Sequence, residues 1–416
     1  MTISRADCAA LDEQDPLRDF RDEFVLPEGV VYLVGNSLGA PPKGAAARVA
    51  RTVEREWGHD LVGGWNAAGW WEQPLRAGDR IAPLIGAGPG EVVAGNTTSI
   101  AIFQTVAAAV RLRPGRRVIV ADLTDFPTDG YIVQNLAEVF GHEVRDIGDI
   151  GNIGNIGDTG ALEALDQDVA VVLLSEVNYR TGARLDVGRV TAAAHAAGAL
   201  MVWDLCHSAG AYQVDVSAAD FAVGCTYKYL NGGPGAPAFL YVNPRHHGSA
   251  RNVLSGWYAH AEPFAFEPGF RPADGVRRFG VSTPHVLSFA GLDAALDIWD
   301  RVDLAAVRAK SVALTSLFIE LVESSGAPGL RLATPRDPAE RGSQVSFHHA
   351  DGYPVMRALI DRGVHGDFRA PDILRFGFAP LYLRYVDVFD AAATFAEVLH
   401  RGLWDAPRYR SRLTVT

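Results

Sequence analysis

The sequence predicts an α/β protein, with a mainly parallel sheet covered by helices on both faces and a smaller α+β domain toward the C-terminus. Between residues 86 and 240, short apolar runs alternate with helical patterns, which is typical of parallel strands joined by helical crossovers. After about residue 291 the sequence becomes helix-rich and then supplies a few strands. The chain of 416 residues also exceeds the roughly 250 to 300 residues at which single hydrophobic cores stop growing.

We expect three parts: an N-terminal arm (1–45), a large domain (46–290) and a small domain (291–416). In the arm, VVYLVGNSLGAPPKGA (30–45) predicts a short strand and a turn, followed by a helix from about Lys43 to Gly58. The expected strands are 91–96, 116–122, 169–176, 198–204 and 220–226 in the large domain, and 342–349 and 372–380 in the small one. The repeat IGDIGNIGNIGDTG (147–160) predicts a glycine-rich surface loop.

Composition excludes several classes of function. The formal net charge of -11 argues against nucleic acid or an anionic membrane as partner. The three cysteines are too few for a disulfide framework, and no Cys/His spacing predicts a metal site. The adjacent pairs His246–His247 and His348–His349 are poor chelators, and we expect them at the surface. The N-terminal residues lack the apolar core of a signal peptide, and no run of about 18 apolar residues occurs, so we expect a cytoplasmic protein.

Polar residues follow the expected strands of the large sheet. Ligands of such sheets bind beyond the carboxyl ends of the strands. The candidate site residues are therefore Asn96, Asp122, Glu176, Asp204 and 226–228.

One lysine in that set stands out, in CTYKYLNGGPGAPAF (225–239). Lys228 follows an apolar strand in a nearly charge-free stretch, which favours a neutral amine able to form a Schiff base. Asp204 ends another apolar strand one crossover upstream. A pyridoxal phosphate (PLP) site requires this pair, because the lysine forms the Schiff base and the carboxylate keeps the pyridine nitrogen protonated. Taken singly, a surface lysine and a helix-capping aspartate are the alternatives.

A phosphate site is predicted in AGNTTSIAIFQTVAAAV (94–110), where a strand leads into an apolar helix. The hydroxyls of Thr97 and Thr98 and the N–H groups of the helix start can bind an anion, and simple N-capping is the alternative. In DLTDFPTDG (122–130), Phe126 can cover a planar ring and Asp129 can support its polar edge, whereas a proline-rich turn is the alternative there. No glycine loop of the Walker type occurs.

These residues lie in motifs that resemble the fold-type-I PLP enzymes, and among them the kynureninase family. The motifs are YLVGNSLG, WNAAGWW, GNTTS, DFPTD, WDLCHSAGA, YKYLNGGPGAPAF, GWYAHAEPFAFEPGF, RRFGVSTP and LRFGFAPLY. The resemblance implies a PLP cofactor and hydrolytic Cβ–Cγ cleavage of L-kynurenine to anthranilate and L-alanine, a step of tryptophan catabolism. It also implies a homodimer whose active sites lie at the subunit interface.

The resemblance assigns roles to individual residues. Lys228 is expected to form the Schiff base, Asp204 to hold the pyridine nitrogen and Tyr227 to assist catalysis. The expected cofactor-binding set is Thr97, Thr98, Phe126, Asp129, Asp204, His207, Tyr227, Lys228, Trp257 and Thr283, of which Trp257 and Thr283 come from the partner subunit. The expected substrate-binding set is Arg375, which clamps the α-carboxylate, with Trp65, Asn36, Ser37 and Ser282. No metal is expected.

Other readings of the same residues remain open. An aminotransferase or β-lyase of this fold would use the same cofactor residues, so only product analysis distinguishes it. A cysteine desulfurase needs a nucleophilic cysteine on a C-terminal loop, and none follows Cys225. A PLP-binding regulator would lose the substrate clamp, and the presence of Arg375 and Tyr227 argues against it.

Overall fold

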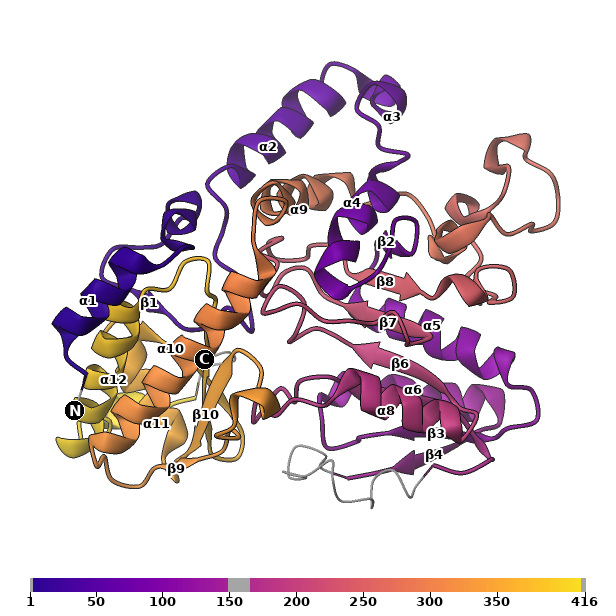
Figure 1. Ribbon diagram of the computed structural model, residues 1–416. Helices are drawn as coiled ribbons and strands as arrows, with labels where there is room; N and C mark the ends of the chain where they lie inside the picture. Colours follow the sequence, from indigo (N-terminus) through magenta and orange to yellow (C-terminus); the bar gives the residue numbers. More distant parts are fainter. Residues whose placement is uncertain (1–2, 149–164, 413–416) are drawn as a thin grey trace.

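The computed structural model describes residues 3–148 and 165–412, which form a large and a small sheet with their covering helices (Figure 1). The seven strands of the large sheet run, in spatial order, β2 (Val92–Ala94), β8 (Phe239–Val242), β7 (Phe221–Gly224), β6 (Leu200–Asp204), β5 (Val169–Ser175), β3 (Val118–Ala121) and β4 (Glu143–Asp146). Strands β7, β6, β5, β3 and β4 are parallel, whereas β8 is antiparallel to both of its neighbours.

Helices cover both faces of this sheet, because its buried strands are apolar on both sides. Helices α5 (Thr98–Leu112) and α6 (Pro127–Phe140) pack on one face, and α8 (Val187–Ala196) packs on the other. Helices α4 (Gln73–Ile81) and α9 (Val286–Trp299) pack on each other, with α4 against the β2 edge. The predicted α/β class is therefore confirmed.

The small sheet is antiparallel. Its order is β12 (Asp367–Arg369), β13 (Ile373–Gly377), β10 (Gln344–His348) and β9 (Arg331–Leu332). The helices of this part are α10 (Leu304–Ser324), α11 (Gly352–Ile360), α12 (Tyr385–His400) and α13 (Pro407–Arg410).

The N-terminal segment packs on the small sheet's helices, as Figure 1 shows at the left of the view. Helix α1 (Arg5–Gln14) contacts α12, and strand β1 (Val31–Tyr32) pairs in parallel with β11 (Val364–His365). From there the chain continues through α2 (Ala45–Arg51), a π-helical turn (Thr52–Trp57) and α3 (Gly64–Ala67). The division of the chain at residues 45 and 290 stays a prediction.

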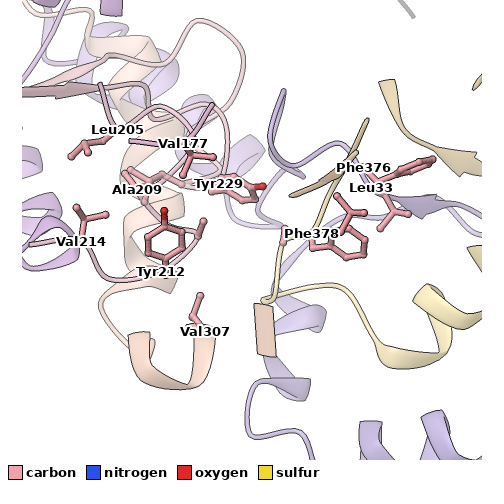
Figure 2. Packing of buried hydrophobic residues seen from close by; sticks show 14 of the residues in the cluster. Leu33, Val177, Leu205, Ala209, Tyr212, Val214, Tyr229, Val307, Phe376 and Phe378 are labelled. Atoms are coloured by element: carbon pink, nitrogen blue, oxygen red, sulfur yellow. The ribbon is translucent and has the colours of Figure 1, made fainter. Parts of the chain in front are cut away.

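One continuous apolar core joins the two sheets. Figure 2 shows Tyr229 and Val177 from the large sheet's loops, with Leu33 and Phe378 from the other part nearby. The Tyr229 hydroxyl donates to the Ser343 carbonyl at 2.7 Å. Because this core is shared, the loops after the large-sheet strands are held at a fixed position relative to the small sheet.

The sequence located most strands but not all of them. All seven expected strand segments contain strands, and the expected helix near residue 43 begins at Ala45. The sequence did not locate strands β4, β8, β9, β11 and β12; β8 follows directly on the glycine- and proline-rich turn after Lys228. The repeat at 147–160 lies, from residue 149 on, outside the described residues. No helix within 3–148 and 165–412 has the length and apolar character needed to span a membrane.

Candidate active site

One cavity lies where the carboxyl ends of β5, β6 and β7 meet, with a volume of about 340 Å³. Its wall includes the predicted residues Thr97, Thr98, Phe126, Asp129, Asp204, His207, Tyr227 and Lys228. Segments that are far apart in the sequence therefore meet in one place. This is where ligands of α/β sheets bind.

The loop that carries Lys228 is fixed on both sides. Within the loop, the Gly232 N–H donates to the Thr226 carbonyl at 2.8 Å. From the N-terminal segment, the Gly39 N–H donates to the Tyr227 carbonyl at 2.8 Å. A Cβ on Gly39 would lie only 2.3 Å from the Lys228 carbonyl oxygen, so this close approach requires glycine. The backbone around Lys228 is thus held in place before any ligand binds.

The Lys228 amine meets a histidine that has one nitrogen without a partner. Lys228 Nζ lies 3.0 Å from His207 Nε2. Burial, and after it the charge of Lys228, holds the pKa of His207 well below its usual value, so the ring is neutral. A neutral ring that accepts at Nε2 carries its proton on Nδ1, and His207 Nδ1 is buried without a partner. An unpaired buried donor is costly, and it fits an acceptor atom of a ligand in the cavity.

Carboxyl groups crowd one side of the cavity. The Cys206 N–H donates to Asp204 Oδ1 at 2.7 Å, and the Asp129 side chain hydrogen-bonds to Asp204. Burial, followed by the charge of Asp204, raises the pKa of Asp129 well above its usual range, so Asp129 is the protonated partner that donates. Burial also raises the pKa of neighbouring Asp125 to about 7. Asp204 therefore presents a negative charge to the cavity, which suits a protonated ring nitrogen.

The N-terminus of α5 opens into the same cavity. Thr97 is the N-cap, and its hydroxyl accepts the Ile100 N–H at 3.4 Å. Thr97, Thr98 and Ser99 all line the cavity, and the first N–H groups of a helix have no partner within the helix. The N-cap therefore does not exclude the predicted anion site, because the helix start carries a partial positive charge.

Phe126 supplies an aromatic surface. Its side chain is 46 % exposed although it lines the cavity, and its ring packs edge-on against Tyr179 with centroids 5.5 Å apart. Lys228 Nζ lies 5.9 Å from the Phe126 centroid. An exposed ring beside an amine, a carboxylate and an anion-binding helix start fits a flat, phosphorylated aldehyde such as PLP.

Arg375 lies outside this cavity. Its Nε and Nη2 donate to Asp367 at 2.6 and 2.5 Å, and its Nη1 donates to the Tyr179 carbonyl at 2.7 Å. Arg369, which was not predicted, lies two residues from Asp367 along β12 and bonds the same carboxylate at 2.9 Å. Arg369 Nε is buried without a partner. The Asp-x-Arg spacing of an alternating strand was the signal that could have found Arg369.

Four other predicted residues also lie apart from the cavity of Lys228. The Trp65 ring contacts that of Trp257 edge-to-face, with centroids 5.6 Å apart. Ser282 and Thr283 line a separate, smaller pocket beside Asn96. Within one subunit, these residues are not brought to Lys228.

Asn36 connects the N-terminal segment to the small sheet, and Ser37 lies in the turn beside it. Asn36 Nδ2 donates to Gln344 Oε1 at 2.7 Å, and a Cβ on Gly377 would lie 2.2 Å from Asn36 Oδ1. The Ser37 N–H donates to the Val34 carbonyl at 2.9 Å. Neither residue lines the cavity.

Two expectations from the sequence were wrong. Glu176 was a site candidate, but it is fully buried and accepts from Arg184 Nε at 3.0 Å and from the Tyr212 hydroxyl at 3.3 Å, so it is a structural ion-pair partner. His246 and His349 were expected at the surface, but they are 9 % and 7 % exposed. Among the residues that the structure describes, no cluster of His, Cys, Asp or Glu could hold a metal ion.

Known proteins match the chain over its full length. It is 49% identical to the kynureninase of Burkholderia pseudomallei (strain K96243) over 99% of this chain and 100% of that protein. It is 47% identical to the kynureninase of Pseudomonas fluorescens with the same coverage. The chain belongs to the kynureninase family. Residues 307–395 also match the model of the kynureninase C-terminal domain.

Solved structures identify the fold of this family member. An apo cysteine desulfurase from Thermococcus onnurineus NA1 has a TM-score of 0.77 at 21% identity, covering 92% of this chain and 98% of that one. A C-DES mutant with glycine linked to its PLP cofactor has a TM-score of 0.78 at 19% identity, covering 91% and 99%. The fold is that of the fold-type-I PLP enzymes.

Proposed function

We propose that the protein is a PLP-dependent hydrolase that cleaves the Cβ–Cγ bond of L-kynurenine, giving anthranilate and L-alanine. Membership of the kynureninase family supports the reaction. The observation that carries the chemistry is the single cavity that unites Lys228, Asp204 and the N-terminus of α5. PLP, when bound, withdraws electrons from the α-carbon of an attached amino acid.

Lys228 and Asp204 perform the central tasks. The Lys228 amine would hold the cofactor and would serve as the base that takes the proton from the substrate α-carbon. Asp204 accepts a hydrogen bond from the ring nitrogen and keeps that nitrogen protonated. The protonated Asp129 supports it, because a donor to Asp204 fixes the orientation of the carboxylate.

Tyr227 donates and His207 accepts a hydrogen bond close to the Lys228 amine. Burial raises the pKa of Tyr227 above its usual value, so its hydroxyl keeps its proton and acts as a donor near the γ-carbonyl when water adds there. His207, held neutral, accepts from Lys228 Nζ and offers Nδ1 to the cofactor ring.

The α-carboxylate of the substrate is bound by Arg369 together with Arg375. Arg375 is already paired on two sides by Asp367, whereas Arg369 retains an unpaired Nε. After burial and the charge of Lys228, the charges of both guanidinium groups also lower the pKa of His207, which supports a position on the side of the small sheet that faces the cavity. Arg375 then positions Asp367, and Arg369 supplies the free donors.

The active site is completed in a cytoplasmic homodimer, with Trp257, Thr283, Ser282 and Trp65 reaching the partner's cavity. This arrangement accounts for their separation from Lys228 within one subunit. A mixture of inactive Lys228→Ala and Thr283→Ala proteins, unfolded and refolded together, tests it. Mixed dimers retain one intact site, so about a quarter of the wild-type sites return. If verified mixed dimers stay inactive, the two subunits do not share residues between their active sites.

The function itself is tested by product analysis. The purified protein with PLP is incubated with L-kynurenine, and anthranilate and alanine are quantified, with Lys228→Ala as control. Borohydride reduction before proteolysis labels the lysine that holds the cofactor, and the label is expected on Lys228. A label on another lysine contradicts the site, and a keto acid product in place of alanine indicates an aminotransferase.

A further inference from the structure

Two cysteines lie side by side under the cavity. Cys206 follows β6 and Cys225 follows β7, and these strands are parallel neighbours in which Asp204 stands opposite Val223. The chain turns directly after β6, where the Cys206 N–H donates to Asp204 Oδ1 at 2.7 Å, and this turn brings the Cys206 carbonyl oxygen to 3.8 Å from Cys225 Sγ.

The two thiols already interact. Their side chains hydrogen-bond to each other, and Cys225 Sγ also lies 3.8 Å from the Cys206 carbonyl oxygen. Both thiols are free, as is distant Cys8. A bond between the sulfurs would thus require little movement of the backbone.

An oxidant can reach one of them. Cys206 lines the cavity, and its Sγ lies 3.8 Å from Thr98 Oγ1, so a small oxidant entering the cavity meets this sulfur. Burial raises the pKa of Cys225, but the hydrogen bond from Cys206 and the charge of Lys228 outweigh it and lower that pKa overall. The hydrogen bond to Cys225, followed by burial, raises the pKa of Cys206 well above its usual value, so Cys225 is the more acidic thiol and the one that attacks Cys206 in the second step of an oxidation.

We propose that Cys206 and Cys225 form a reversible disulfide when a hydroperoxide enters the cavity, and that this bond switches the site off. The Cys206 sulfur bonds to one peroxide oxygen, the O–O bond breaks, and the thiol proton of Cys206 passes to the other oxygen, which leaves as water. The Cys225 sulfur then attacks the Cys206 sulfur and expels its hydroxyl group as a second water. Two thiols lose two electrons and two protons, and hydrogen peroxide is reduced to two waters.

The disulfide between Cys206 and Cys225 changes the segments after β6 and β7, which carry the active-site residues. Cys206 lies between Asp204 and His207, and Cys225 lies two residues before Tyr227. Drawing the two sulfurs to bonding distance shifts these ends and the Thr98 contact. A bound cofactor covers the Cys206 side of the cavity, so the protein without PLP is expected to oxidise faster.

Mass spectrometry tests the proposal without relying on activity. Trypsin releases both cysteines in one peptide, residues 190–228, which should lose two hydrogens after peroxide treatment and resist alkylation until reduced. Further cleavage with chymotrypsin should give two peptides joined through Cys206 and Cys225. PLP should slow this change, and dithiothreitol should restore cofactor binding, measured by absorbance.

Serine variants separate the outcomes. Cys225→Ser should prevent the disulfide and the reversible loss of PLP binding, whereas Cys8→Ser should behave as wild type. The proposal is overturned if residues 190–228 gain oxygen atoms without losing two hydrogens, if Cys8 is the linked partner, or if Cys225→Ser loses PLP binding under peroxide as reversibly as wild type.

Discussion

Asp204 and Asp220 lie at opposite ends of the same two strands and have opposite surroundings. Asp204 ends β6 beside the cavity, with Asp129 and Asp125 crowded around it. Asp220 directly precedes β7 and is 1 % exposed. Its carboxylate accepts from four donors at 2.7 to 2.8 Å, namely His195 Nε2, His246 Nε2, Arg245 Nη2 and the Met201 N–H.

The surroundings of Asp204 and Asp220 distinguish a functional carboxylate from a structural one within the same sheet. At the Asp220 end every charge has a partner, which is how buried charges normally occur. At the Asp204 end three carboxyl groups crowd together, the pKa values of Asp129 and Asp125 are raised, and His207 Nδ1 is unpaired. Such an arrangement costs stability, and it persists where a ligand completes it. The end with the unpaired group is the one to which we assign the active site.

The largest effect is expected from Asp204→Asn. An amide cannot keep the cofactor nitrogen protonated. The value of kcat should therefore fall by about 10³-fold, which lies within the range that one general acid or base contributes to a rate. The free energy of unfolding should hold or rise, because the crowding with Asp129 is relieved. Steady-state kinetics and urea denaturation measure the two quantities. A variant with normal kcat and lower stability would make Asp204 a structural residue like Asp220.

The sequence revealed the cavity better than the Asp220 cluster, for a physical reason. Lys228, Asp204 and Thr97 each follow a local signal, since a strand end or a helix start fixes where the side chain points. Asp220 meets His195 and His246 only through tertiary packing, so the sequence suggested a surface histidine pair instead. Arg369 was missed although its spacing from Asp367 is a local signal, because the role that we propose for it also depends on how β12 pairs with β13.

Asp220→Asn is expected to show the reverse pattern. It should lower the free energy of unfolding by about 3 kcal/mol, the lower end of the cost of breaking a buried ion pair, because Arg245 and His195 are partly exposed and can be solvated. The kcat of the folded fraction should not change. Urea titration checks the first expectation and active-site-normalised kinetics the second; a fall in kcat at full stability would contradict the division between the two ends.

Arg369 and Arg375 extend the same comparison to the small sheet. Arg369→Ala should raise KM by about 100-fold, roughly 2.7 kcal/mol, with little change in stability. Arg375→Ala should lower stability, because Asp367 is then left buried with a single partly exposed partner. Arg336→Ala, which removes an exposed ion pair with Glu323, is the control. If Arg375→Ala alone raises KM at full stability, Arg375 is the clamp.

The most gradual effect distinguishes the two ends by pH. Burial raises the pKa of Asp125 to about 7 from its usual 3.8, so the folded protein binds the extra proton between these values. Its contribution to stability therefore falls as pH rises from about 4 to about 7, by at most about 1.4 kcal/mol per pH unit. The hydrogen bonds from its partners outweigh burial and lower the pKa of Asp220, so its contribution is lost only as pH falls below about 4.

Urea midpoints of the protein without PLP, measured from pH 3 to 8, test both slopes. Asp125→Asn should flatten the decline between about pH 4 and 7 and leave the acid limb as it is. Asp220→Asn should flatten the acid limb and leave the neutral slope. The two effects are expected to add in the double variant, because the residues lie at opposite ends of the sheet and share no partner. A neutral slope that survives Asp125→Asn would mean that another buried carboxyl, with Asp129 the first to examine, holds the proton instead.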